Sequence, residues 1–167
     1  MLRLASALLV GVVAGASLAT HAAVAPQQAG AAGAAPLTPA LELGNFSVSL
    51  VVKDVAASLA FYEKLGFKKV FGGVKQRFVI VQNATATIGL FQGGIEATTL
   101  TFNPGWDRSM KTQEKFDDVR TIQEVLEERD VELELRADPD STGPASLRVL
   151  DPDGHAILID QHVPKPK

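Results

Sequence analysis

Apolar and polar side chains alternate along residues 46–52, and this alternation predicts a β-strand with one buried face. The spacing of the apolar residues then becomes helical, with Asp54 placed to cap the helix and Gly66 to end it. Three short strands are predicted next, at about 68–71, 77–82 and 86–91.

The same order of patterns returns in the second half of the chain. A strand is followed by a helix that begins at Asp117 or Asp118. The four strands predicted in this half cover 98–102, 131–135, 145–150 and 155–160. Two strand–helix–three-strand units, with helices at one face of a mixed sheet, predict an α+β domain.

The first residues have the pattern of an export signal. Arg3 precedes an uncharged apolar run, and small residues follow it. We therefore expect a signal peptide over 1–22, a disordered linker over 23–44, a folded domain over 45–163 and a tail over 164–167. The protein would then be exported, periplasmic or secreted in a bacterium, with no stable membrane insertion after cleavage. An uncleaved anchor is the alternative, because the apolar run approaches the length that spans a bilayer.

Composition excludes several kinds of site. The chain has no cysteine, which excludes disulfides, thiolate metal sites and a cysteine nucleophile. Its formal net charge is -3, so it has no excess of basic residues, and we expect no nucleic-acid partner.

Three segments carry a family resemblance through their order and spacing. They are 51–54 (VVKD) running into 58–67 (SLAFYEKLGF), then 100–102 (LTF), then 151–154 (DPDG). Together they resemble the vicinal oxygen chelate superfamily, which includes glyoxalases, extradiol dioxygenases, fosfomycin-modifying enzymes and bleomycin-binding proteins. The resemblance covers about residues 45–162. It implies two βαβββ modules that form a cup-shaped mixed sheet, with helices on the outer face and a ligand inside the cup.

The resemblance also implies metal ligands on the first and last strand of each module. Family enzymes commonly carry His, Gln or Glu there, whereas the matching positions here are Ser47, Gly89, Thr99 and Leu158. Neutral hydroxyls bind divalent metals weakly, and glycine and leucine side chains offer no donor atom. We therefore expect a member that lacks the usual ligands and uses no metal and no cofactor. A shift of two residues in the final strand would instead bring in Asp160.

Strand alternation, together with a loop tryptophan and an arginine in an apolar strand, gives a set of candidates for the cup. The predicted ligand-binding residues are Ser47, Ser49, Thr87, Thr99, Thr101, Asn103, Trp106, Arg148, Leu158 and Asp160. Such a hydroxyl-rich wall suits hydrogen bonds to a neutral polar or aromatic molecule. The alternative is that these are small residues tolerated on a concave face.

Four of the polar and aromatic residues have a second interpretation. Trp106, the only tryptophan, can cap the cup or plug one end of the core, and we favour the plug. Arg148 can clamp an anion or face water, and the sequence leaves both open. Asp160 and His162 fall on one face of the last strand and can form a base with its orienting partner, but we favour an ordinary surface pair. No catalytic residue is assigned.

Three functions remain open from the sequence. The first is metal-independent binding of an unknown small organic molecule. The second is a glyoxalase-like lyase, isomerase or dioxygenase with an atypical site, so whether the chain is an enzyme is undecided. The third is a dimerising interaction module without a small ligand, and a homodimer is compatible with the resemblance because members often pair modules across subunits.

Overall fold

The computed structural model describes residues 40–167, and these lie in one compact unit that spans 37–167. The first βαβββ module consists of β1 (Asn45–Val51), α1 (Val55–Lys64), β2 (Lys68–Gly73), β3 (Phe78–Gln82) and β4 (Thr87–Phe91), with a short 3-10 turn, η1 (Val74–Gln76), before β3. The second module repeats this order with β5 (Thr99–Asn103), α2 (Val119–Glu128), β6 (Leu133–Leu135), β7 (Ala145–Leu150) and β8 (Ala156–Gln161). The predicted order of elements is confirmed.

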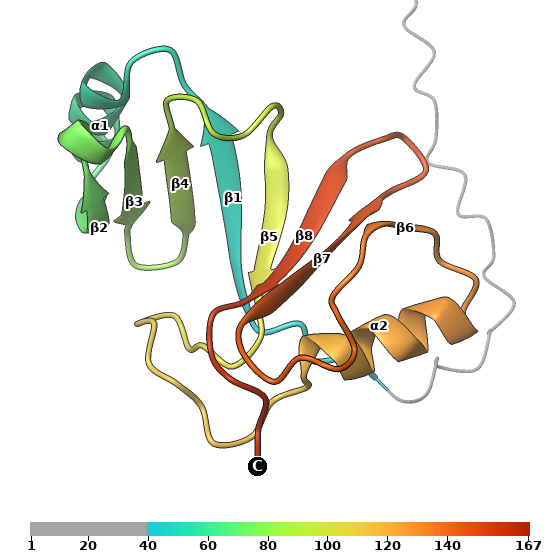
Figure 1. Cartoon of the computed structure of the whole chain (residues 1–167). Coiled ribbons are helices and arrows are strands. Elements are labelled where there is room, and N and C mark those ends of the chain that lie inside the picture. Colours follow the sequence, from blue (N-terminus) through green and yellow to red (C-terminus); the bar gives the residue numbers. More distant parts are fainter. Residues whose placement is uncertain (1–39) are drawn as a thin grey trace, which may run out of the picture. The chain divides into compact units, whose positions relative to one another are not determined.

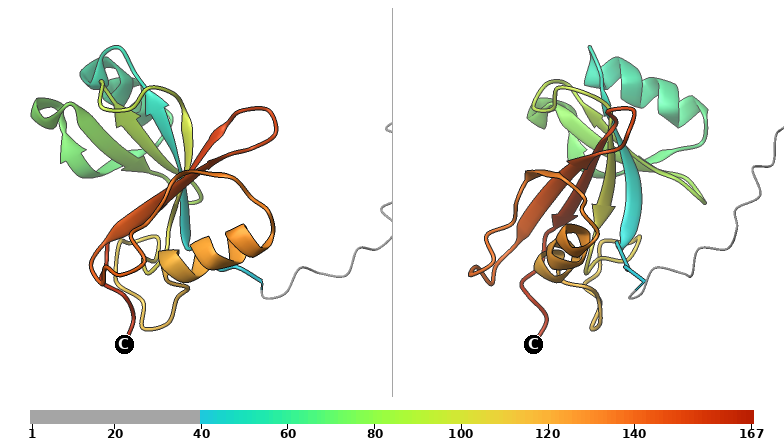
Figure 2. Two further views of the ribbon diagram at one scale, coloured as in Figure 1. Left: turned by 45° about the vertical axis from the view of Figure 1, so that its right-hand side comes forward. Right: turned by 90° about the vertical axis from the view of Figure 1, so that its right-hand side faces the viewer.

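One eight-stranded mixed sheet joins the two modules, in the order β2-β3-β4-β1-β5-β8-β7-β6 (Figure 1). Within each module the first strand runs parallel to the last, β1 with β4 and β5 with β8. The modules meet where β1 pairs antiparallel with β5, and Ser47 lies opposite Thr101 in that pairing. The sheet curves without closing into a barrel, and α1 and α2 lie outside the curve (Figure 2). The α+β fold class with a cup-like sheet is therefore confirmed.

Each helix covers a hydrophobic core on the convex side of its own module. Asp54 caps α1 by accepting from the backbone N of Ala56 at 2.8 Å and of Ala57 at 3.1 Å. The helix packs mainly on β3 and β4, and the core beneath it is formed by Val55, Phe67, Val79, Val81 and Leu90. Side chains alternate between the two faces of β3 and β4, so every second residue packs beneath α1 and the residues between them face the cup.

The second module has a matching core beneath α2. Asp118 caps this helix by accepting from the backbone N of Arg120 at 3.0 Å. The core beneath it is formed by Val119, Ile122, Leu133, Ala137, Leu147, Val149 and Ile159. Leu41 and Leu43 also pack against this core, although both fall in the segment predicted as a linker.

Most predicted strand boundaries differ from the observed ones by one or two residues, and the start of β3 has a clear structural cause. We expected a strand over 77–82, but β3 begins at Phe78. Arg77 has a left-handed backbone, with φ of 62°, and its Nε donates to the carbonyl of Gln92 at 3.0 Å. The turn of η1 causes the difference, because it places Arg77 at its C-terminal end.

The predicted signal peptide over 1–22 and most of the predicted linker lie outside the described residues. Among the described residues, no helix is long and apolar enough to cross a membrane. At the other end of the chain, Lys165 donates its backbone N to the carbonyl of Thr142 at 2.9 Å.

Candidate functional site

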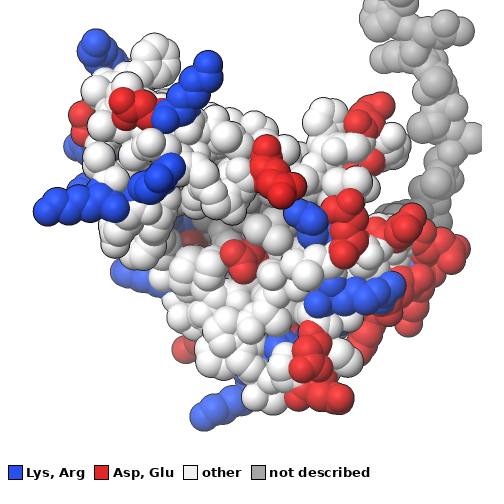
Figure 3. Space-filling model, turned by 45° about the horizontal axis from the view of Figure 1, so that its top comes forward, with Lys and Arg blue, Asp and Glu red and all other residues white. Residues whose placement is uncertain are grey.

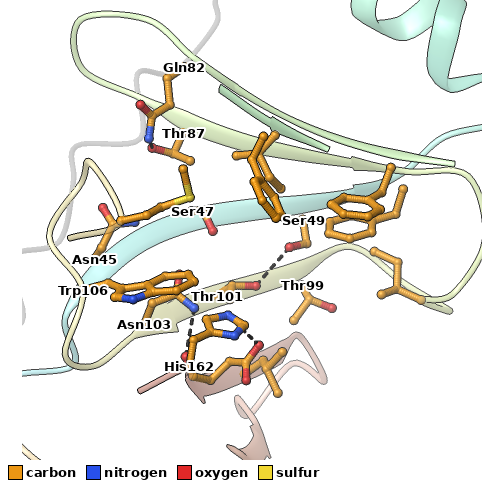
Figure 4. A pocket seen from close by; sticks show the side chains of 18 residues that line it. Asn45, Ser47, Ser49, Gln82, Thr87, Thr99, Thr101, Asn103, Trp106 and His162 are labelled. Atoms are coloured by element: carbon orange, nitrogen blue, oxygen red, sulfur yellow. Dashed lines mark hydrogen bonds and ion pairs between the residues drawn. The ribbon is translucent and has the colours of Figure 1, made fainter. Parts of the chain in front are cut away.

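The concave face of the sheet holds a cavity of about 720 Å³ (Figure 4). Residues from β1, β3, β4, β5 and β8 form its floor, and the connection after β5 forms one end. The lining residues are Asn45, Ser47, Ser49, Phe71, Phe78, Ile80, Gln82, Thr87, Phe91, Ile95, Thr99, Thr101, Asn103, Trp106, Met110, Leu158, Asp160 and His162.

Alternation along β1 and β5 places a row of hydroxyls on the floor of the cavity. Ser47 pairs with Thr101 and Ser49 with Thr99 across the module junction, so their side chains lie on the same face. Ser49 Oγ and Thr101 Oγ1 are hydrogen-bonded at 3.1 Å. The Thr99 hydroxyl donates to the carbonyl of Ala97 at 3.1 Å.

Three phenylalanines form what we call the aromatic wall: Phe71, Phe78 and Phe91. Phe78 and Phe91 are cross-strand partners, and their rings stack with centroids 5.8 Å apart and planes 10° apart. Phe71 lies beside Phe78 with centroids 5.9 Å apart. A flat apolar surface of this kind favours contact with a planar or hydrocarbon group.

The segment 104–118, which we call the strap, closes the cavity at the end away from the aromatic wall. Trp106 and Met110 from the strap line the cavity. Arg108 fastens the strap to the first module, because its guanidinium donates to the carbonyls of Asn83, Ala84 and Ala86 in the turn between β3 and β4. Gln82 Nε2 in turn donates to the carbonyl of Arg108 at 2.8 Å.

The end of β8 brings two ionisable side chains into the cavity beside the tryptophan. His162 Nε2 lies 3.2 Å from Asp160 Oδ2, and the imidazole stacks on Trp106 with ring centroids 4.2 Å apart (Figure 4). Asn103 Nδ2 donates to the backbone carbonyl of Asp160 at 3.0 Å, so a side chain of β5 is bonded to β8 beside this pair. Burial raises the pKa of Asp160, and the charge of His162 acts in the opposite direction without cancelling it.

The structure places nine of the ten predicted ligand-binding residues in this lining. The tenth, Arg148, is level with Leu158 across the β7–β8 pair but lies in an adjoining pocket, where its Nε contacts Glu134 Oε2 at 3.0 Å. An arginine clamp inside the cavity is therefore not formed. That these residues bind a ligand stays a prediction.

One interpretation that we favoured from the sequence is wrong. Trp106 does not plug the core, because it stacks on His162 at the cavity end. The interpretation of Asp160 and His162 as a surface pair stays open, since both line the cavity but their side chains are 31% and 41% exposed.

Several lining residues were missed, chiefly those of β2, β3 and the strap. They are Asn45, Phe71, Phe78, Ile80, Gln82, Ile95 and Met110. The same alternation rule applied to β3 would have found Phe78, Ile80 and Gln82, because they pair with residues of β4 that face the cup. Met110 has no such signal, since the strap has no periodicity.

The donor atoms at the four positions matched to metal ligands do not fit a divalent metal. Gly89 and Leu158 offer no donor, and the Thr99 hydroxyl is engaged with Ala97. Among residues 40–167, no three His, Cys, Asp or Glu side chains lie together in a way that could hold an ion. Asp160 and His162 form a pair without a third ligand of these types.

Charge is divided unevenly between the modules (Figure 3). Residues 45–93 include six Lys or Arg and two Asp or Glu, whereas residues 94–163 include seven Lys or Arg and sixteen Asp or Glu. The hollow between the modules is lined mainly by uncharged side chains. The second module, which supplies Asp160 and His162, is therefore strongly acidic.

A curved sheet of paired βαβββ modules around a central cavity defines the class of protein. The chain belongs to the Glyoxalase/Bleomycin resistance protein/Dioxygenase superfamily, whose family model matches residues 46–159. A comparison with curated proteins found no match.

Solved structures similar to this chain include two with a TM-score above 0.5. One, described as an NAD-dependent benzaldehyde dehydrogenase from Legionella pneumophila, is 20% identical, with a TM-score of 0.53 over 71% of this chain and 99% of that one. The other is a superfamily member from Vibrio splendidus, 15% identical, with a TM-score of 0.51 over 71% of this chain and 98% of that one. At these identities the likeness shows the fold alone.

Proposed function

We propose that this protein is exported and binds a small organic molecule in the cavity without needing a metal ion. The observation that carries the proposal is the cavity itself, whose volume of about 720 Å³ lies in the range of small-molecule sites, about 300–1,000 Å³. Its lining combines an apolar wall with a few convergent hydrogen-bonding groups, which is the usual composition of such sites.

The open cavity counts against a module that only dimerises. Such a module would fill its cup with its own side chains, notably Phe91 and Trp106. Here Phe91 lies flat in the aromatic wall and Trp106 lies at the strap, and space remains between them.

An acid–base catalyst is the second candidate, and one contact favours it. The Asp160–His162 pair has the separation of a base and its orienting partner, and both side chains face the cavity. Turnover that survives a chelator but is lost in Asp160→Ala would favour this candidate over binding alone.

Export rests on the sequence of residues 1–22. Expression of the full chain in a bacterium, followed by mass spectrometry of the periplasmic and culture fractions, tests it. A mature N-terminus near residue 23 is the expected result, and a full-length chain in the cytosol would contradict export.

Binding is tested by a thermal-shift screen on the mature domain. A compound present at a hundred times its Kd stabilises the fold by about 2.7 kcal/mol, which raises the Tm by roughly 10 °C in a domain of this size. Ser47→Phe adds bulk on the cavity floor, where no side-chain hydrogen bond is lost, and should abolish the shift. Ala57→Phe on the exposed side of α1 is the matched control and should preserve it.

The metal-independent part of the proposal has its own measurement. Dialysis against divalent metals followed by elemental analysis should find no stoichiometric metal, and chelator should leave the ligand-induced shift unchanged. A tightly held equivalent of metal that the shift requires would contradict the proposal.

A further inference from the structure

The cavity is divided into an apolar part and a polar part that lie diagonally apart. Phe91 is level with Val51 at one end of β1, whereas Asp160 is level with Asn103 and Asn45 at the other. β1 and β5 lie between β4 and β8 and separate these two strands by about 14 Å across the sheet. The aromatic wall and Asp160 also lie toward opposite ends of the strands, so they are farther apart than that. A molecule that contacts both needs an apolar body and a polar group at some distance from it.

The described residues that line the cavity include no Lys or Arg. Asp160 and His162 are the ionisable side chains among them. Arg148 lies opposite the lining residue Leu158 in the β7–β8 pairing, but it is paired with Glu134 in the adjoining pocket. An anionic group placed in the cavity would therefore lose water without gaining a cationic partner, apart from His162, which already contacts Asp160.

The carboxylate of Asp160 has unused capacity for a donor. Its Oδ2 contacts His162 Nε2, and no other side-chain hydrogen bond reaches it within the part of the chain described. Burial raises the pKa of this carboxyl, which means that its charge is incompletely compensated. A hydrogen-bond donor from a bound molecule, above all a cationic one, would compensate it.

We propose that the cavity selects a mainly apolar molecule with an amine or another donor group, that Asp160 anchors this group, and that molecules bearing a carboxylate or phosphate are rejected. This rests on the proposed binding function and specifies its ligand class. The aromatic wall holds the hydrocarbon part, and the acidic second module favours approach of a cation over an anion.

Three compounds with one skeleton test the selection: 4-phenylbutylamine, 4-phenylbutanol and 4-phenylbutyrate. Trp106 is the only tryptophan and lies in the cavity, so its fluorescence reports binding without a label, and calorimetry gives the Kd. The amine should bind at least tenfold more tightly than the carboxylate, with the alcohol between them.

Asp160→Asn keeps the shape of the side chain and removes its charge. In this variant the amine should lose its advantage over the alcohol. Glu128→Gln, on the exposed side of α2, changes net charge equally and should leave the order of the three compounds unchanged.

The outcomes separate the two proposals. If the carboxylate binds as tightly as the amine, the selection is wrong while binding in the cavity stands. If the amine keeps its advantage in Asp160→Asn, the anchor is wrong. If none of the three compounds changes Trp106 fluorescence or releases heat, cavity binding fails and the selection fails with it.

Discussion

Gln161 Nε2 donates to Asp118 Oδ2 at 2.9 Å, on the face of β8 opposite to the cavity. Gln161 Oε1 also accepts from the backbone N of Val119 at 2.8 Å, so one fully buried side chain joins the end of β8 to the start of α2. Asp160 and His162 flank Gln161 in the sequence and face the cup. The position of the cavity's ionisable pair is therefore fixed from behind by a buried polar network.

Removing this join should cost stability. Gln161→Leu leaves the buried N of Val119 and the carbonyl of Val163 without this partner, and it removes one of the two donors to Asp118 Oδ2. We expect a loss of about 2–4 kcal/mol in the free energy of unfolding, measured with urea. Gln76→Leu, in the exposed η1 turn, is the matched control and should change it by less than about 0.5 kcal/mol.

The charge of Asp118 should make stability depend on pH in the acid range. Burial raises the pKa of Asp118, but hydrogen bonds from Gln161 and Arg120 outweigh burial and leave it below the usual 3.8. Since the folded state binds this proton less tightly than the unfolded chain, ionised Asp118 stabilises the fold above about pH 4, and the contribution is lost as pH falls further. Asp118→Asn, which can still cap α2, should be less stable than wild type at pH 7. A difference that stayed constant from pH 7 down to pH 3 would contradict this cause.

The charge of Asp160 should affect the pH dependence of stability in the opposite direction to that of Asp118. Its pKa is raised by burial, so the ionised form costs stability at any pH above the folded-state pKa, and the cost vanishes below the unfolded value near 4. Asp160→Asn should therefore be at least as stable as wild type at pH 7, and any advantage should shrink as pH falls toward 4. Thermal unfolding across this pH range measures it. A variant clearly less stable at pH 7 would mean that the His162 contact matters more than burial.

The strap should loosen when its fastening is removed. Arg108→Ala deletes the guanidinium that contacts three carbonyls of the β3–β4 turn. Exchange of the backbone N–H groups of Asp107 and Gln113, which bond to Lys111 and Gly105 within the strap, should speed up by about tenfold, equivalent to about 1.4 kcal/mol of local stability. Lys115→Ala, which removes an exposed cation from the same segment, should not change these rates. Hydrogen exchange read by NMR makes the comparison.

The strands and their faces could be predicted because alternation is a local property of the sequence. Once Ser47 is placed toward the cup, period 2 places Ser49 on the same face, and the pairing of β1 with β5 does the same for Thr101. The helices could also be predicted, since Asp54 caps the first, and Asp118, one of the two candidates, caps the second.

The contacts among the residues at the cavity's polar end could not be predicted in this way. The stacking of Trp106 on His162 joins the strap to β8, and no periodicity relates two segments that far apart in sequence. The same holds for Gln161, whose neighbours in the sequence face the cup while its own partners come from α2. Long-range polar contacts of this kind depend on tertiary packing and leave little trace in local pattern.

The phenyl ring of Phe91 lies over Gly89, so that a Cβ built on the glycine would come within 2.5 Å of the ring's Cε2 atom. An engineer who wished to graft a metal centre onto this scaffold could not begin with Gly89→Glu alone, because the new carboxylate would meet the ring first. Phe91 would have to turn away or be shortened in the same step, and its stack with Phe78 would be lost with it. A metal site that uses position 89 therefore involves both residues of β4 at once, in addition to donors from β5 or β8.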